Sequence, residues 1–315
     1  MERQVLVGLQ PYYYEHPLDR SALEALQGTP GLETLVRKVN EYGFERLLRI
    51  QYTGSNLKVT SESFPDIHET FIHATKILNL AIKPDLYLQE GHGINAFTAG
   101  IQKPIVILNS ACIDHLSLDE LLFIIGHELG HVKSGHSLYH QIGALLPMIG
   151  GIVSDMTFGL GRLVSATLYA ALMHWRRMSE FTADRAGLLV AQNRDASISA
   201  MIKVAGLPFK MYGQFNIEDF VGQAREFQDF DANYLDKIAK FLSSMDQSHP
   251  WTVLRAAEFD RWTRSGEYNR ILTACEDRAG EGPRFCTYCR SQLVGDEQYC
   301  PACGRQVIPP SFPFS

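Results

Sequence analysis

The sequence has no excess of basic residues. Its 315 residues include 29 Lys and Arg against 35 Asp and Glu, which gives a formal net charge of -6, and no segment is rich in lysine or arginine. Proteins that bind nucleic acid through its phosphates usually carry a basic patch or stripe. We therefore expect no nucleic-acid partner.

The N-terminus lacks the features of a secretory signal. Residues 1–20 contain no basic segment followed by an apolar stretch and a small-residue cleavage site. We therefore expect a cytoplasmic protein that stays in the compartment where it is made.

A long uninterrupted hydrophobic run is also missing. Residues 142–175 are apolar apart from Asp155 and Arg162, but a proline and a pair of glycines interrupt them, and each uncharged half has only 13 residues. A membrane-spanning helix needs about 20 apolar residues. The segment favours one or two buried or amphipathic core helices. A hairpin that dips into a membrane is the alternative, which would place the protein at the periphery of a membrane.

Cysteines are few, and four of the six lie near the C-terminus. These four form two Cys-x-x-Cys pairs: Cys286, Cys289, Cys300 and Cys303. The spacing is typical of a structural zinc site, so residues 285–306 predict a four-cysteine zinc ribbon with room for a short hairpin between the pairs. Two disulfides in an oxidising compartment are the alternative. Cys112 and Cys275 have no catalytic context, and we expect them to be buried thiols.

The remaining chain predicts a predominantly helical α+β domain over residues 1–275. Apolar residues fall at helical spacing in a lead-in that extends to about residue 80, and short β-forming runs predict a small sheet between Pro84 and Asn109. Later segments predict helices around Ser179 to Gln192, Ile217 to Phe227, Tyr234 to Met245 and Trp251 to Arg264. A charged segment with Gly and Pro, residues 276–284, predicts a linker to the ribbon, and 307–315 form a tail.

A capping box formed by Ser117 and Glu120 begins a helix at Leu118, and this helix contains the pattern His127-Glu128-x-x-His131. Residues four apart lie on one face, so both imidazoles can bind one ion, while Glu128 lies about 100° around the helix and can reach a water at that ion. Gly126 and Gly130 share a face, where another element can approach closely. The pattern is typical of a catalytic zinc site, and a structural histidine pair on an apolar face is the alternative.

A catalytic zinc site needs a third protein ligand. A metzincin site would require Gly at position 134 and His at 137, where this sequence has serine. We therefore interpret His136 and His140 as solvated side chains or as hydrogen-bond partners of a ligand. Glu180 is the better candidate, because Glu180 and Asp184 lie four residues apart, so one carboxylate can bind zinc while the other accepts the free N–H of a ligand histidine. Two carboxylates on a solvated helix face are the alternative.

Four segments together resemble the zinc metallopeptidase family that includes HtpX and the CAAX prenyl proteases, within the gluzincins. They are HELGH at 127–131, EFTAD at 180–184, NAFTAG at 95–100, and Ser248-His249-Pro250 followed by Arg255. The resemblance implies a zincin-like domain in which Asn95, Ala96 and Phe97 lie on the edge strand that pairs with an extended substrate. It also implies that His249 and Arg255 lie near the metal and stabilise an oxyanion.

These observations predict a zinc-dependent metalloendopeptidase acting on polypeptides, with Glu128 as general base, and the resemblance implies a role in protein quality control. One catalytic and one structural zinc ion are the expected cofactors, and the ribbon would recognise a protein partner or shield the protease domain. Membrane-embedded members of the family contain clear membrane-spanning helices, which this sequence lacks, so a prenylated substrate is not favoured. A zinc-binding scaffold without turnover is the competing hypothesis, and the presence of Glu128 argues against it.

Overall fold

The computed structural model describes residues 3–41, 44–143, 160–229, 252–280, 284–285 and 292–293. Helices form most of this chain: η1 (Pro11–Tyr13), α1 (Pro17–Gln27), α2 (Leu32–Glu41), α3 (Phe44–Ser55), α4 (Pro65–Ile77), α5 (Ser110–His115), α6 (Leu118–Lys133), α8 (Leu160–Ala191), α9 (Arg194–Val204), η2 (Phe209–Gln214), α10 (Ile217–Asp229), α12 (Thr252–Arg264) and α13 (Glu267–Gly280). The strands are β1 (Leu57–Lys58), β2 (Asp85–Gln89), β3 (Ala96–Ala99), β4 (Ile105–Asn109), β5 (Arg284–Phe285) and β6 (Gln292–Leu293). The predicted fold class, mostly helical with a small sheet, is confirmed.

The main sheet is mixed and has the strand order β1-β2-β4-β3. β2 and β4 run parallel, with Leu86 opposite Val106, while β3 runs antiparallel to β4, with Phe97 opposite Ile107. β4 reads IVILN and is buried except at its last residue, as expected for a strand covered on both faces. The sheet predicted between Pro84 and Asn109 is confirmed, and β3 forms one of its edges.

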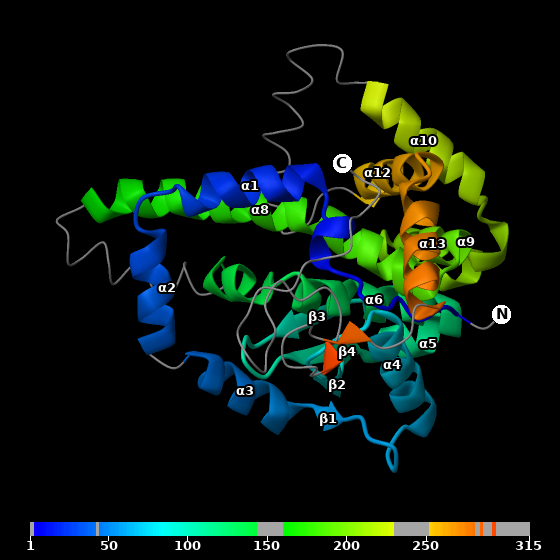
Figure 1. The fold of residues 1–315 in the computed structure, drawn as a ribbon, viewed down its shortest axis with the longest axis horizontal. Helices are drawn as coiled ribbons and strands as arrows, with labels where there is room; N and C mark the ends of the chain where they lie inside the picture. The colour runs from blue at the N-terminus through cyan, green and yellow to red at the C-terminus, as the bar shows by residue number, and fades with distance from the viewer. Residues whose placement is uncertain are drawn as a thin grey trace.

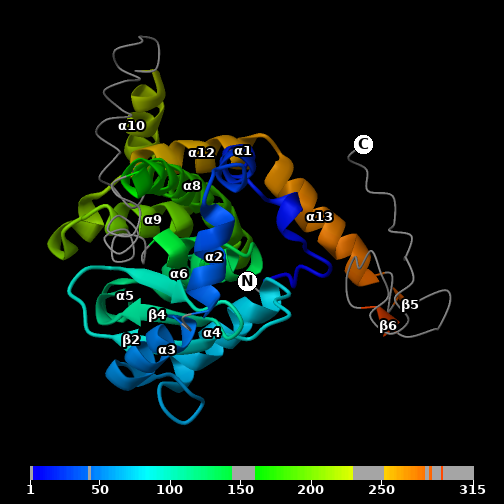
Figure 2. The same ribbon diagram turned by 90° about the vertical axis from the view of Figure 1, so that its left-hand side faces the viewer.

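Helix α6 lies between this sheet and helix α8 (Figures 1 and 2). The predicted capping box begins it: Glu120 Oε2 accepts a hydrogen bond from the Ser117 backbone N–H at 2.7 Å, and Ser117 Oγ accepts one from the Glu120 N–H at 3.4 Å. Every residue from Glu120 to His131 except Ile124 is buried. A helix that is apolar on nearly every side must be covered on every side, and α6 is therefore a rigid central element.

Helix α8 is one continuous helix, and α1 lies along it (Figure 1). Its first half buries Leu168, Leu172 and Trp175 in a hydrophobic cluster that includes Leu26 of α1. This spacing makes residues 167–175 amphipathic. Of the helices in the described part of the chain, none combines the length and hydropathy needed to cross a bilayer.

Two expectations about helix boundaries need correction. The helix expected from Ser179 is the second half of α8, since no break separates it from the segment before it. Helix α13 extends to Gly280, so the first five residues of the expected linker 276–284 are helical. Ile271 and Cys275, one turn apart, are buried and anchor α13, and the Glu and Ala residues that follow favour its continuation. The helix predicted from Tyr234 to Met245 lies outside the described residues.

Candidate metal centre

Two packed helices bring three metal-binding side chains together. α6 contributes His127 and His131, α8 contributes Glu180, and one ligand atom from each lies within 4.8 Å of the others. His127 Nε2 lies 3.4 Å from Glu180 Oε2, and His131 Nε2 lies 3.6 Å from Glu180 Oε1. All three side chains are buried. The carboxylate therefore faces the same nitrogen of both imidazoles.

Glycine residues allow the two helices to approach this closely. A Cβ atom at Gly130 would lie 2.5 Å from Ala186 Cβ, and one at Gly126 would lie 2.6 Å from Val190 Cβ. These separations are too short for real Cβ atoms, so α6 can approach α8 this closely at Gly126 and Gly130 only because these positions have no side chain. The predicted close approach at this glycine face is confirmed, and it explains why Glu180 reaches the histidines of α6.

The donor set fits zinc. Two imidazole nitrogens and one carboxylate oxygen are typical of catalytic zinc sites, which keep a fourth position open. Burial lowers the pKa of His127, but hydrogen bonds to Asp184 and Glu180 raise it to about 10. The carboxylates thus favour positive charge at this point, which a divalent cation supplies while the imidazoles stay neutral. Burial lowers the pKa of His131 to about 4, which favours the neutral form that binds metal.

Asp184 and Arg255 lie on the Nδ1 side of His127. Asp184 Oδ1 is 3.0 Å from His127 Nδ1, and Arg255 of α12 donates to Asp184 from Nε at 2.8 Å and from Nη2 at 2.5 Å. Arg255 Nη1 also lies 3.5 Å from Glu180 Oε2. With Nε2 facing Glu180, His127 donates its Nδ1–H to Asp184, which fixes the ring and its tautomer. Arg255 balances the charge of both carboxylates.

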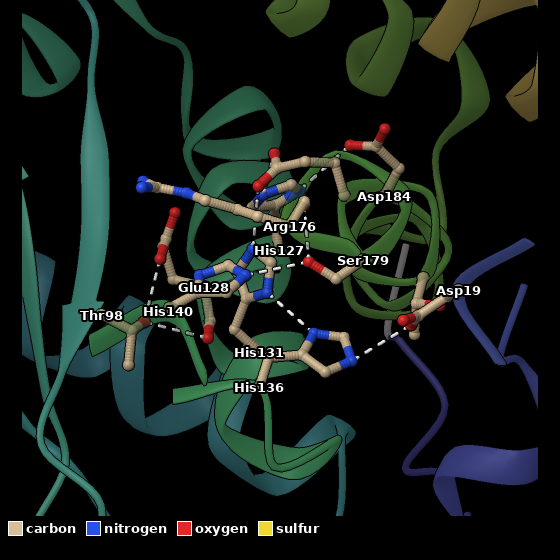
Figure 3. A network of polar contacts seen from close by, with 12 residues as sticks. Asp19, Thr98, His127, Glu128, His131, His136, His140, Arg176, Ser179 and Asp184 are labelled. Carbon is tan, nitrogen blue, oxygen red and sulfur yellow. Dashed lines mark hydrogen bonds and ion pairs between the residues drawn. The ribbon is translucent and has the colours of Figure 1, made fainter. Parts of the chain in front are cut away.

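Glu128 is buried beside His127 and is held by a strand residue. Thr98 Oγ1 lies 2.9 Å from Glu128 Oε2 and 3.1 Å from the Glu128 backbone oxygen (Figure 3). Burial raises the pKa of Glu128, while the charge of His127 and the Thr98 hydrogen bond lower it less strongly. The role of Thr98 was not predicted from the sequence. Side chains on one face of a strand recur every second residue, so Thr98 lies on the same face as Ala96, and this spacing is the signal that could have identified it.

The residues predicted to bind substrate lie on or beside β3. Ala96 and Phe97 are in the strand, and Asn95 directly precedes it. Phe97 packs against Tyr52, with ring centroids 5.2 Å apart, so its side chain belongs to a hydrophobic cluster. No strand among the described residues pairs with the outer edge of β3.

A second network lies behind His131 (Figure 3). His131 Nδ1 is 2.9 Å from His136 Nδ1, and His136 Nε2 is 3.1 Å from Asp19 Oδ2. His140 Nε2 is 2.9 Å from Ser179 Oγ. His136 is buried and contacts the ligand His131, so the interpretation of His136 as a hydrogen-bond partner of a ligand holds and its interpretation as solvated is wrong. His140 is partly buried, and burial lowers its pKa well below its usual value. Asp19 was missed, because nothing in the sequence near residue 19 indicates a partner 117 positions away.

The geometry described above agrees with a comparison of the whole sequence with protein families. The profile of Peptidase family M48 matches residues 61–263, more than half of the chain. The chain belongs to peptidase family M48. Metallopeptidases of the M48 family use zinc, so this M48 chain is a zinc-dependent protease that acts on polypeptides, and the predicted HtpX-like family is confirmed.

Individual relatives carry the same assignment in their names. The M48 chain is 31% identical over 261 residues to "Plastoglobule-localized metallopeptidase 48, chloroplastic" of Arabidopsis thaliana. The matched region covers 82% of this chain and 74% of the relative. It is 23% identical over 248 residues to "Protease HtpX homolog 2" of Methanosarcina acetivorans, covering 70% of this chain and 80% of the relative. No solved structure matches the chain.

Two groups of predicted residues of the M48 chain lie outside the described residues. One is His249, and the other is the set of four ribbon cysteines. Near these cysteines, β5 and β6 pair as an antiparallel two-stranded sheet, with Phe285 opposite Gln292. This strand pair flanks the first Cys-x-x-Cys pair, whereas the hairpin was expected between the two pairs. The ribbon itself stays a prediction.

Proposed function

We propose that this M48 enzyme is an endopeptidase in which Glu128 is the general base at a zinc ion held by His127, His131 and Glu180. One observation supports this above all: the three ligand atoms lie within 4.8 Å of one another, and the buried carboxylate of Glu128 is on the same helix as the two histidines. Burying an ionisable group is costly unless it is paired or used. A zinc-binding scaffold has no use for a base at this position.

The chemistry follows from what each group does. Zinc supplies Lewis acidity, which polarises the scissile carbonyl and lowers the pKa of water at the site. Glu128 accepts a proton from the attacking water and then donates it to the leaving amine nitrogen, so the C–N bond breaks without a covalent enzyme intermediate. The raised pKa of Glu128 makes it a stronger base than an exposed carboxylate. Thr98 donates a hydrogen bond to this carboxylate and orients it.

Asp184 and Arg255 have supporting roles in this proposal. Asp184 holds His127 with Nε2 directed toward the metal, as partners of ligand histidines generally do. The contacts of Arg255 with Asp184 and Glu180 support a role in positioning those carboxylates. Stabilisation of the oxyanion by Arg255 and His249 is a further part of the proposal and depends on the family resemblance.

The edge of β3 is the proposed substrate site. An extended peptide can add to an open sheet edge through main-chain hydrogen bonds. Here Asn95, Ala96 and Phe97 would provide the backbone groups that face away from β4, because the Asn95 backbone oxygen already accepts a hydrogen bond from the Asn109 N–H at 2.9 Å. The side chain of Thr98, in the same strand, contacts Glu128. A peptide bound along β3 would therefore pass close to the general base Glu128. The family resemblance implies that the substrates are damaged or unfolded proteins.

We also propose that the four ribbon cysteines bind a second zinc ion, which is structural, and that the ribbon recognises a protein partner. Support comes from the spacing of the two Cys-x-x-Cys pairs. A segment of this size has too small a core to fold without a metal or another crosslink. Cys300→Ser should lower the zinc content from about two ions per chain to about one, with the catalytic site retained.

The test of the proposed function compares the wild type with Glu128→Gln. Both proteins should bind about two zinc ions per chain, measured by elemental analysis. The wild type should cleave unfolded casein, and Glu128→Gln should cleave it about 100- to 10,000-fold more slowly, the usual range for loss of a general acid–base.

Glu120→Gln is the matched control. Glu120 is a buried glutamate of the same helix, but it contacts Ser199 and Lys203, not the metal ligands, so this variant should retain cleavage. If the zinc-loaded wild type cleaves no polypeptide, with or without added lipid, the endopeptidase assignment fails and the scaffold hypothesis replaces it.

A further inference from the structure

We infer that Asp19, contributed by helix α1, positions the zinc ligand His131 through His136. The inference rests on the proposed function, because it assigns a role toward the catalytic metal. The three side chains form a continuous path: His131 Nδ1 to His136 Nδ1 at 2.9 Å, and His136 Nε2 to Asp19 Oδ2 at 3.1 Å. Figure 3 shows this path. Each of the three side chains is almost completely buried.

The path has one consistent arrangement of protons. His131 Nε2 faces Glu180 at 3.6 Å, so a metal ion bound there leaves the ring proton on Nδ1. That proton is donated to His136 Nδ1, which must then be unprotonated, so His136 carries its own proton on Nε2. Nε2–H is then donated to Asp19. A carboxylate at the end of the path thus selects one tautomer of each neutral ring.

Asp19 is itself held firmly. Thr182, two residues after Glu180 in α8, donates from Oγ1 to Asp19 Oδ2 at 2.6 Å, and the His16 backbone N–H donates to Thr182 Oγ1 at 3.0 Å. Asp19 also lies in the first turn of α1, where the helix dipole stabilises a negative charge. The carboxylate is therefore built into the contact between α1 and α8 and cannot turn away from His136.

The cost of this arrangement argues against a purely stabilising role. Among the described residues, Asp19 Oδ1 has no hydrogen-bond partner although it is buried. An unsatisfied buried polar atom costs about 1–3 kcal/mol, and an apolar side chain would avoid that cost. The position is better explained by what Oδ2 does for His136.

The two histidine ligands are then supported in the same way. His127 contacts the carboxylate of Asp184 directly, at 3.0 Å, and His131 reaches the carboxylate of Asp19 through one intervening imidazole. Asp19 lies outside the matched residues 61–263. The segment before the family domain therefore completes the metal centre. Tyr14 helps to hold this segment in place: its hydroxyl lies 3.0 Å from Ser134 Oγ, and Arg185 donates to its backbone oxygen at 3.3 Å.

The test measures zinc affinity by competition with a chromophoric chelator, in the full-length protein. Asp19→Asn keeps the size of the side chain and removes its charge, and His136→Phe keeps an aromatic ring and removes both nitrogens. Each variant should bind the catalytic zinc about 10- to 100-fold more weakly than the wild type, the usual effect of removing a partner of a ligand histidine. Asp19→Glu, which restores a carboxylate, should recover part of the loss.

Glu120→Gln is again the control, because it removes a buried carboxylate that contacts Ser199 and Lys203 and should lower thermal stability without changing zinc affinity. If Asp19→Asn does not fold, Thr182→Val should still weaken zinc binding several-fold, because it replaces by a methyl group the hydroxyl that donates to Asp19 and accepts from the His16 N–H. Wild-type affinity in Asp19→Asn and His136→Phe would overturn the inference and leave the proposed function intact. A wild type without catalytic zinc would overturn both.

Discussion

The contact between α6 and α8 at Gly130 yields a quantitative prediction for Gly130→Ala. The new Cβ would lie 2.5 Å from Ala186 Cβ and 3.4 Å from Ala183 Cα, whereas carbon atoms pack at about 3.5–4.0 Å. Both atoms belong to helix backbones or to rigid Cβ positions, so no rotamer change relieves the overlap and the helices must separate. Overpacking of this kind costs about 1–3 kcal/mol.

A second effect acts in the opposite direction. Alanine is favoured over glycine in a helix interior by about 1 kcal/mol. Because the overlap at Gly130 is severe, we place its cost at the upper end of the range, and the net result is a loss of about 2 kcal/mol in the free energy of unfolding. Separation of the helices also moves Glu180 away from His131, so zinc affinity should fall in parallel.

The assay is urea denaturation in the presence of a chelator, combined with chelator competition for zinc. Gly222→Ala in α10 is the matched control, since nothing lies within 4 Å of a Cβ at that position. It should gain up to about 1 kcal/mol in stability and leave zinc affinity unchanged. Adding Ala186→Gly to Gly130→Ala should relieve the overlap, with a favourable coupling energy of about 0.5–3 kcal/mol. If Gly130→Ala equals the wild type in stability and zinc affinity, the helices are not packed as closely as described.

Two further predictions concern protonation. Thr98→Val removes a hydrogen bond to ionised Glu128 and so raises the pKa of Glu128. We expect kcat/KM to fall about tenfold and the acid limb of its pH profile to move to higher pH. An unchanged acid limb would show that Thr98 does not influence the general base. Burial raises the pKa of Asp260, but hydrogen bonds from Arg194 and Arg225, each at 3.0 Å, help to lower it overall. A depressed pKa stabilises the fold above the unfolded value of about 4 and loses that effect as the pH falls through the folded value. Asp260→Asn should therefore be less stable than the wild type at pH 7, and this difference should shrink below pH 4 in chelator-containing urea titrations; a constant difference would contradict the ionic role.

Local signals in the sequence were sufficient for the parts of the fold that depend on neighbouring residues. The capping box at Ser117 marks the start of α6, and the runs DLYLQ and IVILN match β2 and β4. Helix continuity was harder to predict. Nothing local shows that α8 passes unbroken into the stretch around Glu180, because packing against α1 and α6 decides where so long a helix ends.

Within the candidate site, the sequence by itself determined which chemistry is available: two histidines four residues apart on one helix, a glutamate beside the first of them, and a separate carboxylate pair. It did not determine the contacts of His136, which could equally have been solvated, or those of Thr98 and Asp19. Those contacts join segments far apart in the chain, through the close crossing of α6 and α8 at Gly130 and the packing of α1 along α8. The spacing of apolar residues predicts which face of a helix is buried, but only the tertiary structure decides which distant side chain that face contacts.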